Sequence, residues 1–458
     1  MRVGIHDVAG RAFLSDGHPF GSRMTRARAA AAWGSVAAVA LGALLRLCVS
    51  GDVDFSPADE SRYLAMASSV AEGGLSAFHG LVTETLARPE LQQFPTPLRY
   101  GYVLAAACAC KLHGVASFEA LASLSRAAGI VTVVLTAWVG WRVAGARVAA
   151  FAAFVVACSP LALALGRRAL QDSVVVAATT LVLALALELR RDVRMAPSRA
   201  WSLSVGVSLA SAFLVALKET SLFLLLALVV DAAVAAFRDR TVAWRVAPFV
   251  AGPFLAAVGF LAWAGNFAEL RALVEVAERS ADGAYVRAFM AGPPHRVLVD
   301  LLVLAPVATL LAVLGLFAQP AAKSDSSSTR LVATFLLTGL VAASCLPKNV
   351  RFTAALEPAL ALFAALGLSS VAGARVAVTA LTLGGLGVSS WLIFARVFLE
   401  RRVYDPTTFD VLAALDAVPH SGPMSAGTFG APAVAIVVTA VAIALTLGAR
   451  ETNRSRGP

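Results

Sequence analysis

Residues 200–236 read AWSLSVGVSLASAFLVALKETSLFLLLALVVDAAVAA, two apolar runs on either side of a short polar turn. Within the two runs, at 200–217 and 220–236, the one charged residue is Asp231. Each run is close to the roughly 20 apolar residues that an α-helix needs to cross a bilayer. Because the bilayer core offers no water to bond the backbone, such runs span as helices. This stretch therefore predicts two transmembrane helices joined by a tight turn.

The same pattern repeats along the whole chain. Of the 458 residues, 59% are hydrophobic and 14% are charged, against roughly 25% charged residues in an ordinary soluble domain. This composition excludes a water-soluble globule. We predict an all-α, polytopic integral membrane protein with about 12 transmembrane helices. The further candidate spans lie at 30–49, 121–141, 147–165, 173–189, 246–264, 297–317, 331–346, 352–371, 376–395 and 430–448.

The distribution of basic residues predicts the topology. The formal net charge is +10, but the basic residues sit in short clusters between the apolar runs, which is typical of topology signals and not of a nucleic-acid partner. A short run at 98–112 has about 11 uncharged residues between Arg99 and Lys111, which is short for a span. If it does not span, most clusters share the side of the N-terminus. We therefore expect a juxtamembrane helix there, on the outer face, and both termini in the cytoplasm.

This topology divides the chain into five parts. We expect a cytoplasmic tail at 1–29, a transmembrane domain at 30–395, an outer loop at 396–429, a last transmembrane helix at 430–448 and a cytoplasmic tail at 449–458. The transmembrane domain includes an outer loop at 50–120 with juxtamembrane helices, and a further outer connection at 265–296. Long loops tend to carry function, so we expect the site on the outer face.

The first outer loop contains an amphipathic helix. In GDVDFSPADESRYLAMASSVAEGG (51–74), Ser56, Pro57 and Asp59 form a helix start, and the glycines at 73 and 74 end it. An apolar face repeats at helical spacing. It consists of Tyr63, Met66, Ala67 and Val70. Asp59 and Glu60 either complement the helix dipole or act in chemistry, and four carboxylates within nine residues exceed what a helix start requires.

The motif D-E-x-R-Y after the first transmembrane helix resembles the first-loop signature of GT-C membrane glycosyltransferases. Its residues are Asp59, Glu60, Arg62 and Tyr63. The likeness is to the protein O-mannosyltransferase and aminoarabinose-transferase branch. Further similar segments are FPTPLRYGYVLAAACACKLHG (94–114), SPLALALGRRALQDSVV (159–175), LKETSLFLLLALVV (217–230) and LPKNVRFTAALEPALAL (346–362). The resemblance covers roughly residues 30–370, and the proline motif differs from the aminoarabinose-transferase pattern in that Arg99 stands slightly after the position of the usual lysine.

The resemblance implies a GT-C-like fold and a glycosyltransferase activity. Such enzymes take a sugar from a polyprenyl or dolichyl phosphate and transfer it to an acceptor outside the cytoplasm. We therefore expect a hexosyl- or pentosyltransferase domain at 30–395, with membrane lipids around it and an unknown glycan, lipid or protein as acceptor. No organelle signal is visible, so the expected location is a bacterial inner membrane, with the active site on the outer face.

The expected roles of the site residues follow from this chemistry. Asp59 is the expected general base, with Glu60 and Asp172 as further catalytic acids. Arg or Lys residues at outer helix ends would stabilise the phosphate leaving group. The expected substrate-binding residues are Arg62, Tyr63, Arg99, Arg167, Arg168, Lys218, Lys348, Arg351 and the intramembrane Glu357. Asp59 and Asp172 either bind a divalent metal ion or orient the acceptor.

Each of these residues has a structural alternative. The basic residues would otherwise be interfacial anchors, Asp172 an N-terminal helix acid, and Glu357 a partner of a neighbouring helix. For the whole protein the alternatives are a secondary transporter or lipid flippase, and a family member that binds polyprenyl phosphate without catalysis. Transporters are commonly built from matched halves. The carboxylates of this chain gather instead in one outer loop, which favours the enzyme.

Overall fold

The computed structural model describes residues 20–48, 58–93, 95–191, 196–281, 283, 286–287, 290, 292–318, 326–347, 349–372, 375–400 and 426–454. These residues form helices and no strands, so the predicted all-α class is confirmed. The candidate site residue Lys348, the tail at 1–19 and most of the loop at 396–429 lie outside the described residues.

Among the described residues, eight helical segments are long and apolar enough to cross a membrane. Several contain a short 3-10 or π segment, labelled η, continuous with an α-helix. They are α5 (Phe118–Ala144), α8 (Asp172–Arg191), α9 (Pro197–Leu217), η3 and α10 (Glu219–Ser221 and Leu222–Arg238), η4 and α11 (Arg240–Val246 and Ala247–Ala264), α16 (Ser326–Cys345), η5 and α17 (Val350–Leu356 and Glu357–Ala372), and α18 and η6 (Val376–Ile393 and Phe394–Glu400).

Two predicted spans are broken, and in this respect the sequence prediction of single helices was wrong. The span predicted at 147–165 consists of α6 (Ala146–Cys158) and α7 (Pro160–Gly166), bent by 58°. The span predicted at 297–317 consists of α14 (Arg296–Leu304) and α15 (Pro306–Phe317), bent by 117°. In both cases a proline stands at the first position of the second helix. The helix breaks there because proline lacks the N–H that a continuing helix would need.

Within the described ranges there are therefore eight candidate spans by length and composition, or up to ten if each bent pair counts as one. The predicted number of 12 additionally requires α1 (Phe20–Cys48) and α20 (Ala426–Arg454). Their apolar parts are shorter, at Ala32–Cys48 and Ala431–Leu447. Helix α1 begins ten residues before the predicted start at 30, and η6 continues the helical chain to Glu400, into the predicted outer loop.

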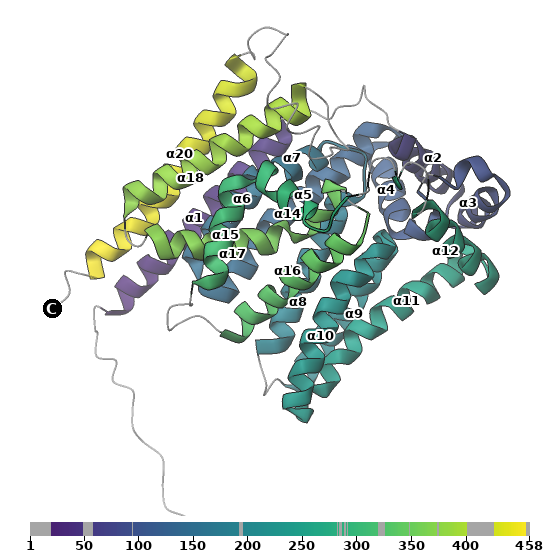
Figure 1. Ribbon diagram of the computed structural model, residues 1–458, viewed down its shortest axis with the longest axis horizontal. Coiled ribbons are helices and arrows are strands. Elements are labelled where there is room, and N and C mark those ends of the chain that lie inside the picture. The colour runs from purple at the N-terminus through teal and green to yellow at the C-terminus, as the bar shows by residue number, and fades with distance from the viewer. Residues whose placement is uncertain are drawn as a thin grey trace, which may run out of the picture.

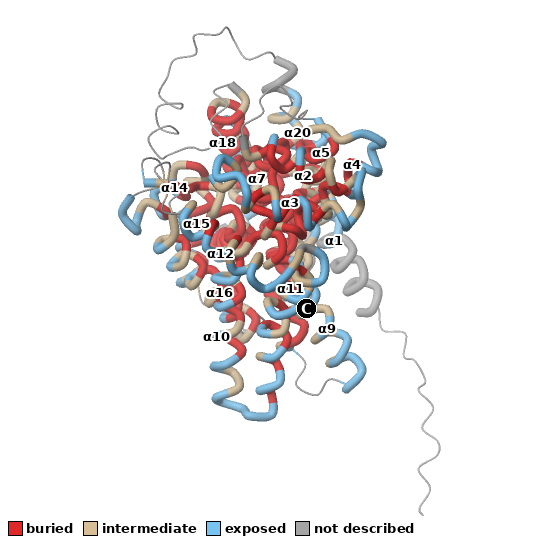
Figure 2. Tube along the Cα trace, turned by 90° about the vertical axis from the view of Figure 1, so that its right-hand side faces the viewer, coloured by how far each residue is buried: buried red, intermediate tan, exposed pale blue. Residues whose placement is uncertain are grey.

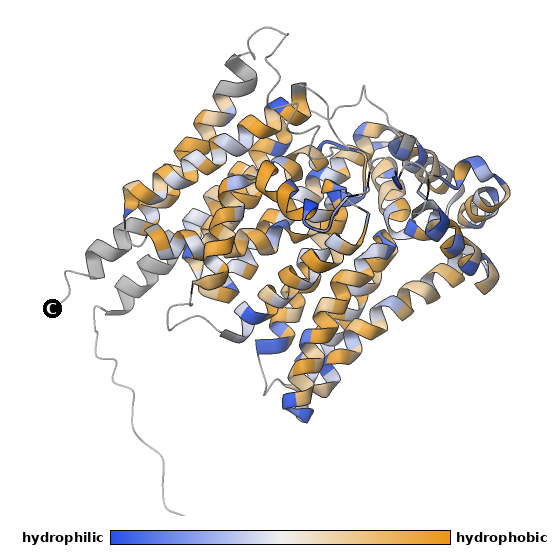
Figure 3. Ribbon diagram, in the orientation of Figure 1, coloured by the Kyte–Doolittle hydropathy of each residue, from blue (hydrophilic) through white to orange (hydrophobic). Residues whose placement is uncertain are grey.

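The spans form one bundle with an apolar exterior, shown in Figures 1 and 3. Helices α1, α18 and α20 lie together on one side, and α9, α10 and α11 on another (Figure 1). Buried residues fill the middle of the bundle, whereas the far ends of α9 and α10 are exposed (Figure 2). Because lipid removes the hydrophobic drive between helices, close packing must hold the bundle together.

A second group of helices gathers at one end of the bundle (Figure 1). It consists of α2 (Ala58–Gly73), α3 (Ser76–Ala87), α4 (Tyr100–His113) and α12 (Phe267–Ala281), with short 3-10 turns at η1 (Pro89–Leu91) and η2 (Pro97–Arg99). We call this group the outer layer. The predicted apolar face of α2 is confirmed, since Tyr63, Met66, Ala67 and Val70 are all buried.

Helix α4 is the juxtamembrane helix predicted at 98–112, and it is not among the candidate spans. It does not lie free on the surface, however. It packs between α2, α5 and α9, with Tyr102 and Val103 fully buried. A Cβ at Gly101 would lie 2.9 Å from Ala216 of α9, so a glycine is needed at this crossing.

Small residues also set the crossing of α15 and α17. A Cβ at Gly367 would overlap the carbonyl oxygen of Leu311, and a Cβ at Gly315 would overlap that of Phe363. We expect Gly367→Ala to force these helices apart and to destabilise the protein by about 1–3 kcal/mol, as overpacking does. The thermal midpoint in detergent should fall by several degrees.

The matched control is Gly385→Ala in α18, where a Cβ meets no atom within 4 Å. This change should leave the midpoint unchanged or raise it, because alanine is the better helix former. Equal midpoints for the wild type and Gly367→Ala would contradict the proposed close crossing.

Candidate active site

A buried ion pair forms the centre of the candidate site. Asp172 is the first residue of α8, and its Oδ1 accepts a hydrogen bond of 2.9 Å from Lys218 Nζ. Lys218 stands between α9 and α10, and its ammonium also lies 4.4 Å from the ring centroid of Phe352. Both charged residues are buried, and the pairing compensates for the loss of water around each of them.

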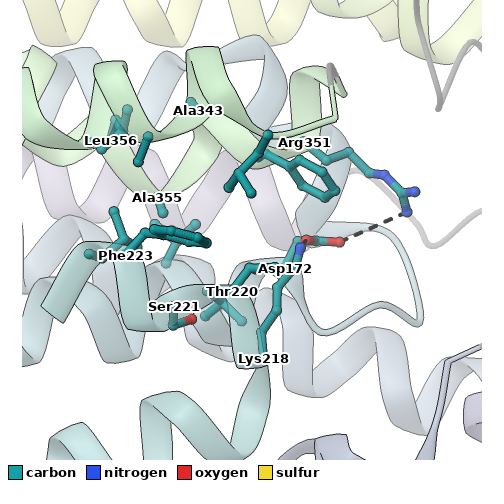
Figure 4. Close-up of a pocket in the computed structure, with 16 residues that line it drawn as sticks. Asp172, Lys218, Thr220, Ser221, Phe223, Ala343, Arg351, Ala355 and Leu356 are labelled. Carbon is teal, nitrogen blue, oxygen red and sulfur yellow. Dashed lines mark hydrogen bonds and ion pairs between the residues drawn. The ribbon is translucent and has the colours of Figure 1, made fainter. Parts of the chain in front are cut away.

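Arg351 joins this pair to the first loop. Its Nη1 lies 4.0 Å from Asp172 Oδ2 and 3.9 Å from Asp59 Oδ2, so one guanidinium faces two carboxylates. Figure 4 shows Lys218 and Arg351 reaching Asp172 from different elements. Asp59 and Asp172 are more than one hundred residues apart in the sequence, and Arg351 follows Asp172 by almost two hundred residues. The fold thus brings residues from four segments of the family resemblance to one point.

Interruptions between α-helices explain this convergence. Lys218 has an extended backbone (φ −160°, ψ 118°) that ends α9 and turns the chain into α10. Arg351 lies in the 3-10 segment η5, which begins where the Asn349 side chain accepts a hydrogen bond of 2.9 Å from the Arg351 backbone N–H. At such interruptions, backbone N–H and C=O groups lack a partner within the helix and form hydrogen bonds with side chains. Charged residues are therefore favoured at these positions.

The two carboxylates differ in their access to solvent. The Asp59 side chain is 39% exposed, whereas that of Asp172 is 6% exposed and bonded to Lys218. A base must reach the proton that it removes. Of the two carboxylates, Asp59 and Asp172, that of Asp59 is therefore the one that an incoming hydroxyl can approach.

A hydrogen-bonded chain from the outer layer supports the segment before Asp172. Arg99 binds Glu219 through two hydrogen bonds, of 3.1 and 2.8 Å, and its Nη1 donates to the Tyr63 hydroxyl at 3.0 Å. The Tyr63 hydroxyl donates in turn to Gln171, the neighbour of Asp172. Burial raises the pKa of Tyr63, so its hydroxyl keeps the proton that it donates. These residues link four segments of the chain and hold Gln171 in place.

The structure gives Glu60 and Arg168 a shared role. Arg168 Nε donates to Glu60 Oε1, and both side chains are almost completely buried. This pair ties the first turn of α2 to the segment at 167–171. Glu60 was predicted to be a catalytic acid, but its carboxylate is occupied by Arg168 and is closed to solvent.

The remaining predicted residues lie farther from the centre or in other contacts. Arg62 donates a 2.9 Å hydrogen bond to Thr85 and lies 3.8 Å from Glu84, which ties α2 to α3. Arg167 is buried at the end of α7. Glu357 accepts a hydrogen bond from Ser159 in a separate cluster within the bundle. Arg62 and Glu357 thus bind partners other than Asp172 and Asp59.

Sequence reasoning missed two partners in this network, Gln171 and Glu219. Both are direct neighbours of predicted residues, Asp172 and Lys218. Glu219 carried a usable signal, because it stands in the polar turn between two apolar runs. Gln171 carried none, since an uncharged amide before an acidic residue has many ordinary roles.

A pocket opens beside the ion pair, between α8, α10, α16 and η5. One end is charged, with Asp172, Lys218 and Arg351 (Figure 4). Its other lining residues are mostly apolar, among them Val175, Val176, Phe223, Leu224, Ala342, Ala343, Leu346, Ala355 and Leu356. This combination suits a ligand with an anionic group at the end of an apolar chain.

Among the described residues, Asp59 and Asp172 leave too few free oxygen ligands for a divalent metal ion in this arrangement. Ions such as Mg²⁺ and Ca²⁺ take six or more oxygen ligands. Here the guanidinium of Arg351 lies between the two carboxylates, and Lys218 occupies one oxygen of Asp172. Among the described residues there is no group of three or more His, Cys, Asp or Glu side chains that could hold a metal ion.

No family model matches the chain, and no curated protein sequence matches it at a significant level. Solved structures do match it. ArnT from Cupriavidus metallidurans, bound to undecaprenyl phosphate, aligns over 92% of this chain and 77% of its own, with a TM-score of 0.53 and 15% identity. The oligosaccharyltransferase of Archaeoglobus fulgidus, tethered to an acceptor peptide with the NVT sequon, aligns over 90% of this chain, with a TM-score of 0.52 and 12% identity.

A third structure, the same oligosaccharyltransferase in complex with Zn and sulfate, aligns over 86% of this chain at a TM-score of 0.50 and 14% identity. This chain spans about half the length of the oligosaccharyltransferase, at 55% and 54% in the two structures. At these identities the likeness is one of fold. The chain therefore shares its fold with ArnT and this oligosaccharyltransferase, which agrees with the fold that the sequence resemblance predicted.

Proposed function

We propose that this protein is a membrane glycosyltransferase that moves a sugar from a polyprenyl-phosphate donor to an extracytoplasmic acceptor. The observation that carries this proposal is the position of Arg351, between the exposed carboxylate of Asp59 and the buried pair of Asp172 and Lys218. That arrangement places an exposed carboxylate 3.9 Å from Arg351, and Arg351 and Lys218 are the two cations at the charged end of a pocket with apolar walls.

The pocket supports a lipid phosphate as donor. Lys218 and Arg351 provide ammonium and guanidinium donors, which form strong hydrogen bonds with phosphate oxygens. The apolar lining, for example Val175, Leu224 and Ala343, suits an isoprenyl chain. The structure of ArnT bound to undecaprenyl phosphate supports the same class of ligand for this fold.

The transfer needs one base and one stabilised leaving group. The acceptor oxygen attacks the anomeric carbon of the donor sugar, and the bond from that carbon to the phosphate oxygen breaks. The acceptor proton passes to the Asp59 carboxylate, while the electron pair leaves with the lipid phosphate. Lys218 and Arg351 stabilise the negative charge that develops there.

The other two acids support the site without touching the acceptor. Asp172 holds the Lys218 ammonium at the pocket, and Glu60 holds Arg168 and with it the segment before Asp172. Both carboxylates are buried and occupied, which leaves Asp59 as the proposed base. No step of this mechanism requires a metal ion.

The enzyme proposal accounts for the asymmetry of the molecule better than a transporter or flippase does. Asp172 and Lys218 lie at helix ends and Arg351 lies in a 3-10 segment, next to the outer layer. The acceptor would be a hydroxyl group of a glycan, a lipid or a protein of the cell envelope. The proposed setting is a bacterial inner membrane, with both termini in the cytoplasm and the outer layer on the opposite side.

The first test replaces the proposed base. We expect Asp59→Asn to reduce sugar transfer by about 100- to 10,000-fold, because the amide cannot accept the acceptor proton. Donor binding should persist, since Lys218 and Arg351 are unchanged. The measurement is transfer of radiolabelled sugar by purified protein from a panel of polyprenyl-phosphate sugars.

The matched control is Glu90→Gln, which removes an exposed carboxylate of the outer layer at η1. It should transfer sugar at the wild-type rate. Full transfer by Asp59→Asn would exclude Asp59 as the base. A folded wild type that transfers no sugar from any donor, but moves lipid or solute across liposomes, would favour the transporter or flippase.

The second test concerns the proposed phosphate contact. We expect Arg351→Gln to weaken the binding of undecaprenyl phosphate by about 10- to 100-fold, which corresponds to the loss of one charged hydrogen bond of roughly 1.5–3 kcal/mol. Native mass spectrometry of the purified protein with added lipid measures the dissociation constant. The control is Arg88→Gln, an exposed arginine paired with Glu84 at the end of α3. Equal affinities for both variants would contradict a phosphate site at Arg351.

A further inference from the structure

A second polar cluster lies inside the bundle and has no part in the proposed transfer. It consists of Arg46 in α1, Ser159 between α6 and α7, and Glu357 at the start of α17, and we call it the brace. Arg46 is 2% exposed. Charged side chains within a membrane bundle are costly, so such a cluster requires a reason.

Arg46 binds the end of α6. Its Nη1 donates to the carbonyl oxygens of Gly42 at 3.1 Å and Ala157 at 3.3 Å, and its Nη2 donates to that of Val156 at 3.3 Å. In a continuous helix the N–H of residue 160 would bond to Val156, but Pro160 has no N–H. The guanidinium therefore supplies donors where the helix breaks, and it stabilises the bend of 58° between α6 and α7.

The opposite helix leaves room for this guanidinium. A Cβ at Gly129 in α5 would lie 2.6 Å from Arg46 Nε, which is closer than real side chains approach. Gly129 and Arg46 line a small cavity together with Glu357. Arg46 and Glu357, from α1 and α17, thus border the same small cavity.

Ser159 joins the helix break to Glu357. Its Oγ donates to the Glu357 carboxylate, with 2.8 Å to each carboxylate oxygen, and accepts a 3.2 Å hydrogen bond from the backbone N–H of Ala162. The second bond makes Ser159 the N-cap of α7. One hydroxyl therefore connects the start of α7 with the start of α17.

The start of α7 and the start of α17 each lie close in the sequence to one part of the candidate site. Helix α7 ends at Gly166, and the chain then passes through Arg168 and Gln171 to Asp172. The segment η5, which carries Arg351, runs directly into Glu357. Helix α7 also packs against η5. The brace is thus the buried connection between the segment that carries Asp172 and the segment that carries Arg351.

We propose that Arg46, Ser159 and Glu357 are positioning residues that fix Asp172 relative to Arg351. The kinetic part of this proposal rests on the proposed glycosyl transfer. From the sequence, Glu357 was expected either to bind substrate or to pair with a neighbouring helix, and its bond to Ser159 corresponds to the second role. Because a displacement of about 1 Å can reduce a rate by roughly 100-fold, a connection of this kind acts on turnover more than on binding.

The test compares two substitutions at Ser159. Ser159→Ala removes the hydroxyl, whereas Ser159→Thr keeps a hydroxyl that can bond both Glu357 and the α7 backbone. For sugar transfer, we expect Ser159→Ala to lower kcat by roughly 10- to 100-fold with the donor KM within about threefold of the wild type. Ser159→Thr should retain most of the kcat. Thr132→Val serves as a control, because Thr132 lines the same cavity but bonds only its own helix at Ala128.

A second readout does not depend on enzyme activity. Hydrogen exchange followed by mass spectrometry should show faster exchange of the amides at 161–171 and at 350–356 in Ser159→Ala, and wild-type exchange in Ser159→Thr and Thr132→Val. Gly129→Ala, which displaces the Arg46 guanidinium, should raise exchange in the same two segments. This variant tests the same connection through a substitution in α5.

The outcomes separate the two proposals. Wild-type exchange in both segments of Ser159→Ala and Gly129→Ala would overturn the brace, whatever the protein catalyses. Equal losses of kcat in Ser159→Ala and Ser159→Thr would also overturn it. A wild type that transfers no sugar would remove the proposed function, whereas faster exchange in the two segments would still support the brace.

Discussion

The buried pair of Asp172 and Lys218, with Arg351 beside it, is the interaction on which the rest of the site depends. Charges withdrawn from water inside a membrane bundle are stable only when they are paired and bonded. Lys218 satisfies one oxygen of Asp172 at 2.9 Å, and Arg351 lies 4.0 Å from the other. The three residues come from different elements, so the cluster can form only when α8, the turn between α9 and α10, and η5 are packed together.

The fold meets this requirement through interrupted helices. Continuous α-helices use their own backbone groups and expose apolar faces to lipid, whereas interruptions free polar groups that side chains must satisfy. Pro160, Lys218 and the segment η5 provide such interruptions. The outer layer then adds Asp59 from outside the bundle, which gives the site one carboxylate that solvent can reach.

Much of this could be predicted from the sequence, because the membrane imposes simple rules. The spans followed from apolar runs of sufficient length, and the helix of the first loop from the spacing of Tyr63, Met66, Ala67 and Val70. The likeness to GT-C enzymes followed from the order of several weak motifs. The convergence of Asp59, Asp172, Lys218 and Arg351 was expected as a list of candidates, and the fold brings these four together.

The rest could not be predicted, for physical reasons that differ from case to case. Hydropathy averages over a window and does not detect a bend, although the prolines at 160 and 306 marked both breaks. The pairing of Glu60 with Arg168, and of Arg99 with Glu219, depends on tertiary distances that no local pattern contains. For the same reason Glu357 was assigned to substrate, because its partner Ser159 lies in a distant helix break.

The most direct test of the central claim is an experimental structure of the protein with undecaprenyl phosphate. We expect the phosphate to lie within hydrogen-bonding distance of Lys218 Nζ and the Arg351 guanidinium. The isoprenyl chain should lie against the apolar pocket wall formed by α10 and α16. A phosphate bound away from both cations, with the contacts of Asp172 and Arg351 unchanged, would contradict it.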